Sequence, residues 1–140
     1  MTFALDLAFG VANEGIVAAM LSTRFGYVEV PVETRAYDLR FLRPGKTDAT
    51  VEVKTDRRAR ETGNVFIETS CSGKPSGITA SPATHWVVDT CGEGVYLLPT
   101  AALRRLVEGS TRSVTGGDGG RARGILVAIC GLRAVSSRID

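Results

Sequence analysis

Residues 49–58, with the sequence ATVEVKTDRR, combine a strand pattern with two side chains that can take part in acid–base or metal chemistry. Val51 and Val53 alternate with Glu52 and Lys54, so one face of the predicted strand is apolar and the other carries a carboxylate and an ammonium group. On its own, this pattern is typical of a solvated ion pair on a sheet. The neighbouring residues decide whether it belongs to an active site.

The segment before this strand predicts a β-hairpin over residues 36–54. The sequence RPGK at 43–46 is a turn signal, in which Pro fixes φ and Gly supplies a positive φ. A three-residue loop would place Asp38 opposite Glu52, whereas a two-residue loop would pair Asp38 with Val51. Three-residue loops that contain Gly are common, so we expect the two carboxylates and the ammonium group on one face.

Two carboxylates that face each other repel, by about 0.2–1 kcal/mol on an exposed sheet and by more where water is excluded. A divalent cation would offset that repulsion. Mg²⁺ takes one or two carboxylates, keeps water ligands and bridges to phosphate oxygens, and Mn²⁺ can substitute for it. Lys54 would then orient a nucleophilic water or neutralise charge on a phosphoryl transition state. The hairpin thus predicts a catalytic group of Asp38, Glu52 and Lys54.

An amphipathic helix is predicted ahead of the hairpin, because apolar residues recur at helical spacing from Ile16 to Leu21. Glu14 lies at the edge of this apolar stripe, where an acid either reaches water or points into a cleft. Asn13 lies nearer the centre of the stripe, and the pattern gives it no role.

The spacing of Asp38, a turn and then Glu52-x-Lys54 resembles the core motif of the PD-(D/E)XK nuclease superfamily. Tyr37 stands where that motif often has Pro, at a position that varies widely. The resemblance implies that the carboxylates bind Mg²⁺ and that Lys54 assists hydrolysis of a phosphodiester bond.

The same resemblance implies a fold and a larger metal site, and it covers roughly residues 5–90. It implies an α/β class (an α+β mixed sheet) with a restriction-endonuclease-like αβββαβ core, in a single domain over residues 1–140. It also implies that Glu14 and Val53 join the two hairpin acids around the metal.

Basic side chains follow the predicted catalytic strand and suggest contact with nucleic acid. The 17 basic residues include three Lys, which leaves 14 Arg, the side chain that makes forked contacts with phosphate. The predicted DNA-contacting residues are Arg57, Arg58, Arg60 and Lys74. A solvated surface explains scattered Arg equally well, and Lys74 is as compatible with a simple loop charge.

Within the superfamily, the chain resembles the small Holliday junction resolvases of archaea and their viruses, and nucleases encoded by phages. The resemblance implies a homodimer that acts on branched or four-way DNA. The alternatives are a repair, restriction or recombination nuclease, and a non-cleaving module that binds nucleic acid on the same fold. A cysteine hydrolase is disfavoured, because Cys71, Cys91 and Cys130 would have to share His85.

Composition places the chain among globular proteins of a single domain. It has 140 residues, of which 44% are apolar and 23% charged. No apolar run reaches the roughly 18 residues of a membrane helix, and the N-terminus lacks the basic start of a secretory signal. The three cysteines have no metal-binding spacing and are predicted to be reduced and buried. We therefore expect a cytoplasmic protein with no membrane partner, in the host cytoplasm if a phage encodes it.

The rest of the chain predicts further elements around a central mixed sheet. Strands are predicted at 65–70, 86–90, 95–99 and 125–130, a helix at 101–109, a helical turn at 81–86 and a Gly-rich loop over 109–124. The last three strands carry more apolar surface than one short helix can cover. Their excess predicts the surface of a homodimer, and the alternative is that these strands form the interior of the sheet.

Overall fold

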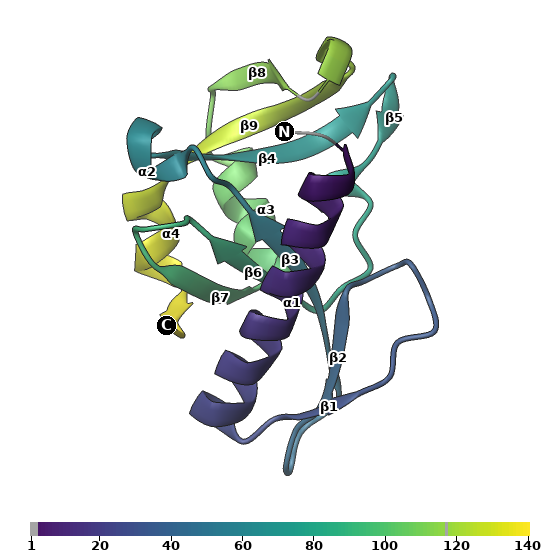
Figure 1. Cartoon of the computed structure of the whole chain (residues 1–140). Coiled ribbons are helices and arrows are strands. Elements are labelled where there is room, and N and C mark those ends of the chain that lie inside the picture. The colour runs from purple at the N-terminus through teal and green to yellow at the C-terminus, as the bar shows by residue number, and fades with distance from the viewer. Residues whose placement is uncertain (1–2, 117) are drawn as a thin grey trace.

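The computed structural model of the chain describes residues 3–116 and 118–140 as a mixed α+β fold (Figure 1). The described residues contain α1 (Phe3–Phe25), α2 (Ala59–Thr62), α3 (Thr100–Glu108) and α4 (Ile129–Val135), with 3₁₀ turns η1 (Gly77–Thr79) and η2 (Asp118–Gly120). The predicted first helix is confirmed as α1, and it ends at Gly26, whose φ of 69° suits glycine.

A six-stranded mixed sheet forms the centre of the molecule, as predicted. Its strands, in spatial order, are β1 (Val28–Val30), β2 (Leu39–Leu42), β3 (Ala49–Thr55), β6 (His85–Asp89), β7 (Val95–Pro99) and β10 (Ser137–Arg138). β3 and β6 are parallel, and all other neighbours in this sheet are antiparallel. The predicted order of helix, strand and hairpin is therefore confirmed in α1, β1, β2 and β3. The connection from β3 to β6 includes α2, which is only four residues long, and two strands of a second sheet.

The second sheet is antiparallel and was not expected. Its strands, in spatial order, are β5 (Lys74–Pro75), β4 (Asn64–Cys71), β9 (Ala122–Ala128) and β8 (Ser113–Gly116). The prediction of a loop throughout residues 109–124 is wrong, because β8 lies within that segment and pairs with β9. The predicted final strand at 125–130 also ends early, since Ile129 and Cys130 begin α4. The predicted helical turn at 81–86 is wrong too, and η1 lies before it.

Two hydrophobic clusters lie on opposite faces of the six-stranded sheet. Figure 1 shows α1 lying across one face, where Val17 and Leu21 pack with Phe41, Val51 and Val87. On the other face, side chains of β6 and β7 pack with β4, β9, α3 and α4, and this cluster includes Trp86, Val88, Tyr96, Leu98 and Val127. Both faces of β6 and β7 are covered, so these strands form an interior layer.

This burial corrects the predicted dimer surface. Val87 and Val88 are fully buried, Leu98 is 1% exposed and Val127 is 4% exposed. These strands therefore fill the interior, because α3, α4 and the second sheet cover them. The homodimer itself remains a prediction that needs another surface. The apolar stripe of α1 is also narrower than predicted, since the Ile16 side chain is 54% exposed.

The β2–β3 hairpin has the register that the three-residue loop predicted. Leu39 pairs with Val51 and Phe41 with Ala49, and this described register ends at Leu39, one residue short of Asp38. The Asp38 N–H donates to the Val51 carbonyl at 3.0 Å, which ties Asp38 to β3 although β2 begins one residue later.

Cysteine burial and membrane character were also predicted from the sequence. All three cysteines are free thiols, but Cys71 and Cys91 are only half-buried and Cys130 is exposed, so the expectation of burial is wrong. Cys130 is exposed because it lies on α4 and not in a buried strand. Within the described residues, no helix combines the length and apolar character needed to cross a membrane.

Two glycines of the second sheet make room for the Phe66 ring. Seen from β4, Phe66 lies over Gly116 of β8 and Gly124 of β9. A Cβ on Gly124 would collide with the Ile67 carbonyl oxygen and lie 2.7 Å from the Phe66 ring. The glycines thus explain why a Gly-rich segment forms a strand here.

We predict that Gly124→Ala destabilises the fold by about 1–3 kcal/mol, because backbone and ring must move to admit one methyl group. Gly131→Ala on α4 is the matched control, since a Cβ at this position would meet only the Leu106 side chain of α3, at 3.8 Å. That control should be neutral or more stable by about 0.5–1 kcal/mol. Urea denaturation measures both changes, and equal stability of Gly124→Ala and the parent chain would contradict the packing described.

Candidate active site

Three carboxyl groups from separate elements gather beside the start of β2, where β3 extends past its neighbouring strand. Glu14 comes from the middle of α1, Asp38 directly precedes β2, and Glu52 lies within β3. All three side chains are partly buried, and the charges of Asp38 and Glu14 both act on Glu52. The structure therefore brings together the three acids that sequence and resemblance selected.

Asp38 is fixed by the backbone of the strand it faces. The Val53 N–H donates to the Asp38 Oδ2 atom at 2.8 Å. In an antiparallel ladder the N–H and C=O of one residue point to the same side, so the Val53 carbonyl also points toward the Asp38 edge of β3. This places the carbonyl of Val53 beside the acids, where the resemblance requires a fourth ligand.

Glu14 and Asp38 share a hydrogen bond between their side chains. Burial raises the pKa of Glu14, and the Asp38 charge and this bond raise it further. Burial also raises the pKa of Asp38, while the bonds from Val53 and Glu14 lower it. The shared bond therefore acts in opposite directions on the two acids, raising the pKa of Glu14 and lowering that of Asp38.

Glu52 shows the largest perturbation in the group. Burial first, and then the charges of Asp38 and Glu14, raise the pKa of Glu52 from 4.5 to about 7. A carboxyl group that resists ionisation beside two other acids is an environment that a bound cation would relieve.

Asn13, for which sequence reasoning found no role, attaches α1 to the catalytic strand. The Asn13 side chain is 7% exposed, and its amide group donates to the Thr55 hydroxyl at 2.8 Å. The contact joins the centre of α1 to the last residue of β3. The contact fixes the position of α1 relative to β3, and so it positions Glu14, the next residue of the helix. An Asn inside an apolar helical stripe was the feature of the sequence that could have indicated such a buried polar contact.

Lys54 extends from β3 on the same side as Glu52, as strand alternation predicts. Its ammonium nitrogen lies 5.6 Å from the centroid of the Phe66 ring, a cation–π contact. Among the described residues no ion pair joins Lys54 to Glu52, and the two side chains line different clefts. The predicted pair therefore shares a face without forming a salt bridge.

The four predicted DNA-contacting residues separate into two groups. Arg57 lies over the Phe9 ring, 4.2 Å from its centroid, and both Arg57 and Arg58 line the cleft of Lys54. Arg60 packs beside Gly92 in the β6–β7 turn. Lys74 lies in β5 opposite the last residue of β4, at the far end of that strand from α2.

Three other charged residues acquire roles that the sequence did not assign. Glu68 accepts a hydrogen bond from the Ser76 hydroxyl at 2.8 Å. Arg35 lines the same cleft as Glu52. Arg112 donates to the Asn64 side chain at 3.1 Å, beside the cleft of Lys54. No motif in the sequence marks these residues.

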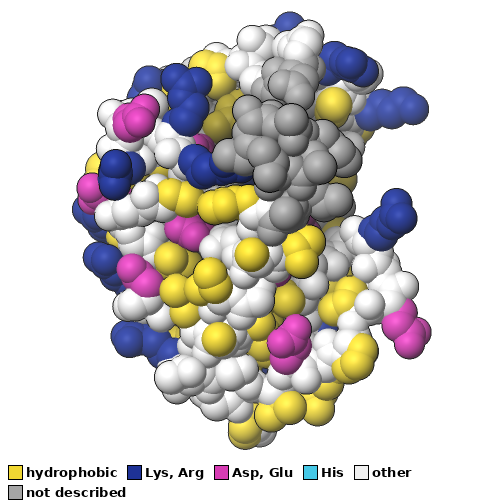
Figure 2. Space-filling model, viewed as in Figure 1, with side chains coloured by type: hydrophobic (Ala, Val, Ile, Leu, Met, Phe, Trp, Pro, Cys, Tyr) yellow, Lys and Arg dark blue, Asp and Glu magenta, His cyan; other side chains and the backbone are white. Residues whose placement is uncertain are grey.

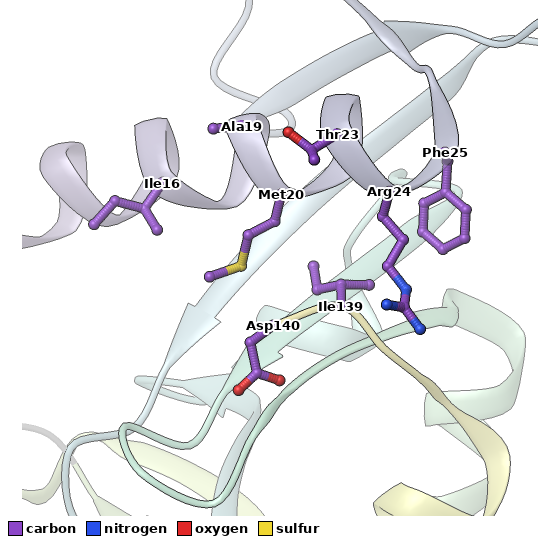
Figure 3. A pocket seen from close by; sticks show the side chains of 8 residues that line it. All are labelled: Ile16, Ala19, Met20, Thr23, Arg24, Phe25, Ile139 and Asp140. Atoms are coloured by element: carbon purple, nitrogen blue, oxygen red, sulfur yellow. The ribbon is translucent and has the colours of Figure 1, made fainter.

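The clefts that the three acids and Lys54 line are small, and a larger cavity lies elsewhere. Glu14 and Asp38 line a cleft of about 500 Å³, Glu52 one of about 430 Å³ and Lys54 one of about 400 Å³. A larger cavity of about 930 Å³ lies between the second half of α1 and the C-terminal residues (Figure 3). It is mostly apolar, as Ile16, Met20 and Phe25 on its wall show, and it includes none of the three acids.

The chemistry of the acid group fits a hard divalent cation in part. Asp38, Glu52 and the Val53 carbonyl offer the oxygen ligands that Mg²⁺ prefers, and Mg²⁺ needs only one or two carboxylates because it keeps its waters. Within the described residues, however, no three His, Cys, Asp or Glu side chains already form a group that could hold a metal ion. Two direct acid ligands, with Glu14 acting through Asp38, agree with both observations.

Comparison with known proteins gives no match from which a function could be assigned. No protein-family model matches the chain, and neither a curated protein nor a solved structure matches it. The geometry of the acids, the backbone and the basic clefts therefore carries the functional argument by itself.

The raised pKa of Glu52 predicts how stability depends on pH. Because the folded state holds this proton up to about pH 7 and the unfolded state releases it near 4.5, stability falls as pH rises between these values. Glu52→Gln removes that loss. At pH 8 in EDTA it should raise stability by roughly 1 kcal/mol after solvent screening, or about 4 °C in melting temperature.

The comparison at low pH is the control for this prediction. At pH 4.5 Glu52 is protonated in the folded chain, so Glu52→Gln should melt at nearly the same temperature as the parent protein. Thermal denaturation followed by circular dichroism measures both. If Glu52→Gln melts at a lower temperature than the parent protein at pH 8, the raised pKa of Glu52 is contradicted.

Proposed function

We propose that this chain is a Mg²⁺-dependent endodeoxyribonuclease that hydrolyses phosphodiester bonds in branched DNA, with a Holliday junction as its substrate. The observation that carries the proposal is the gathering of Glu14, Asp38 and Glu52 beside the free carbonyl edge of β3. The basic cleft that begins at Lys54 supports it, because an acidic group alone would repel DNA.

Each residue has a distinct task in this proposal. Asp38 and Glu52 bind Mg²⁺ with the Val53 carbonyl, and Glu14 keeps Asp38 oriented through their shared hydrogen bond. A Mg²⁺ ion held by these groups would supply Lewis-acid chemistry, which polarises a phosphate and lowers the pKa of a bound water. Lys54 leaves the face of Phe66 and places its ammonium group against the phosphate, over a distance that its flexible four-carbon chain can cover.

The direct test is cleavage of fluorescently labelled DNA with Mg²⁺ or EDTA. We predict that Asp38→Asn, Glu52→Gln and Lys54→Ala each reduce the rate at least 100-fold, since each removes a ligand or a transition-state charge. Glu14→Gln should cost less, because a glutamine can still donate to Asp38. Mn²⁺ should replace Mg²⁺ in the parent protein.

Val135→Ala is the matched control, because this residue is exposed on α4 and lies outside the site. It should cleave at the parent rate. Full activity of Asp38→Asn would contradict the assignment of the site. Cutting of linear duplex as readily as of a four-way junction would contradict the resolvase and favour a repair, restriction or recombination nuclease.

A non-cleaving DNA-binding module is the second candidate, and two observations favour it. The described residues offer no complete group of three metal-binding side chains, and Lys54 rests on Phe66 away from Glu52. If the chain is such a module, it should bind DNA and cleave none of it, whichever divalent metal is added. The same assay therefore separates the two functions.

We predict a homodimer, because resolving a four-way junction requires two cuts related by two-fold symmetry. Sedimentation velocity at micromolar concentration, with and without junction DNA, should give a species of twice the mass of the 140-residue chain. A monomer under both conditions would contradict the resolvase and leave a nuclease that nicks one strand.

A further inference from the structure

A cleft of about 400 Å³ lies between the end of β3 and the outer face of the second sheet. Its lining comes from segments far apart in the chain: the end of β3, the start of β4, the middle of β8 and β9. Lys54 forms its boundary with the acid group. The cleft therefore continues the candidate active site in one direction along the surface.

The floor of this cleft is apolar. Phe66, Val114 and Leu126 share the outer face of the second sheet, because Phe66 pairs with Leu126 and Val114 with Gly124. Gly116 and Gly124 accept one side of the Phe66 ring, and a side chain at either position would displace it. The glycines thus keep the floor low and leave space above β8.

The walls and rim of the cleft are basic. Lys54, Arg57 and Arg58 line it, and Asp56 is the one acid on its described lining. Both Asp56 oxygens accept backbone hydrogen bonds, from Arg58 at 2.9 Å and from Phe66 at 3.0 Å, so its charge is already engaged. Arg112 is held at the rim through Asn64. Figure 2 shows Lys and Arg side chains gathered over α2 and the adjacent end of β8.

An apolar floor with basic walls discriminates between forms of nucleic acid. Duplex DNA presents phosphates to a protein surface and keeps its bases stacked inside, so basic residues alone would suffice to bind it. An unpaired nucleotide presents both a phosphate and an exposed base, which basic grooves with aromatic floors recognise. With a volume of about 400 Å³, the cleft is too small to enclose a duplex.

We infer that this cleft binds an unpaired nucleotide of the DNA strand next to the scissile phosphate, with its base on the Val114–Phe66 floor and its phosphate between Lys54 and Arg58. The inference rests on the proposed function for the position of the scissile phosphate. It adds the substrate class: a strand with at least one unpaired nucleotide beside the cleavage point, as at a branch or flap.

The test measures binding in EDTA, so it does not depend on cleavage. The probes are a fluorescent single strand of about 15 nucleotides and a blunt duplex of the same sequence. Val114→Asp places a carboxylate on the floor, and it should weaken binding of the single strand about tenfold while changing duplex binding less than twofold. Val135→Asp, at an exposed apolar position of α4, is the matched control and should change neither.

Phe66→Leu is the second variant, for the case that Val114→Asp does not fold. It keeps an apolar side chain at this position and removes only the aromatic ring. It should weaken single-strand binding several-fold through loss of the aromatic surface. Equal weakening of single-strand and duplex binding by these variants, or no weakening of either, would overturn the inference. The proposed nuclease is tested separately, since Asp38→Asn should abolish cleavage and retain single-strand binding.

Discussion

The hydrogen bond from the Val53 N–H to Asp38 is the contact on which the candidate site depends. It exists because β2 begins at Leu39 while β3 extends to Thr55, so the β2 side of β3 has backbone groups without a neighbouring strand. Asp38 takes the place of the missing strand at that edge. Because the N–H and the C=O of a strand residue point to the same side, the Val53 carbonyl is also directed toward Asp38.

The position of α1 is set by a second polar contact to the same strand. Asn13 joins Thr55, which brings Glu14 to Asp38 from the opposite layer of the fold. Three acids then share a half-buried region, and their burial and mutual repulsion oppose ionisation of Glu52. A fold that stores such repulsion loses stability in the absence of a cation, as functional sites commonly do.

The hairpin and its acids were predictable from sequence because their arrangement is local. Loop length fixes the register of β2 on β3, and that register brings Asp38 close enough for its charge to act on Glu52. Glu14 at the edge of an apolar stripe was a weaker signal of the same kind. The role of Asn13 was not predictable, since its partner Thr55 lies 42 residues away.

The second sheet was missed because its formation depends on partners distant in sequence. Gly116 and Gly124 suggested a loop, yet each is glycine because Phe66 of another strand lies against it. Similarly, the alternation of β3 predicted the side of the sheet from which Lys54 projects but not that Phe66 would hold its ammonium group. Periodicity identifies strands and faces, whereas contacts between sheets need the three-dimensional structure.

Calorimetric titration of Mg²⁺ into the metal-free protein tests the central claim most directly. At pH 6.5 Glu52 is largely protonated, so each bound ion should displace roughly one proton, measured as a difference in heat between buffers of unequal ionisation enthalpy. At pH 8.5 the proton release should vanish and the affinity should rise. Absence of binding at both pH values, or equal binding by Glu52→Gln, would contradict a metal site built on these three acids.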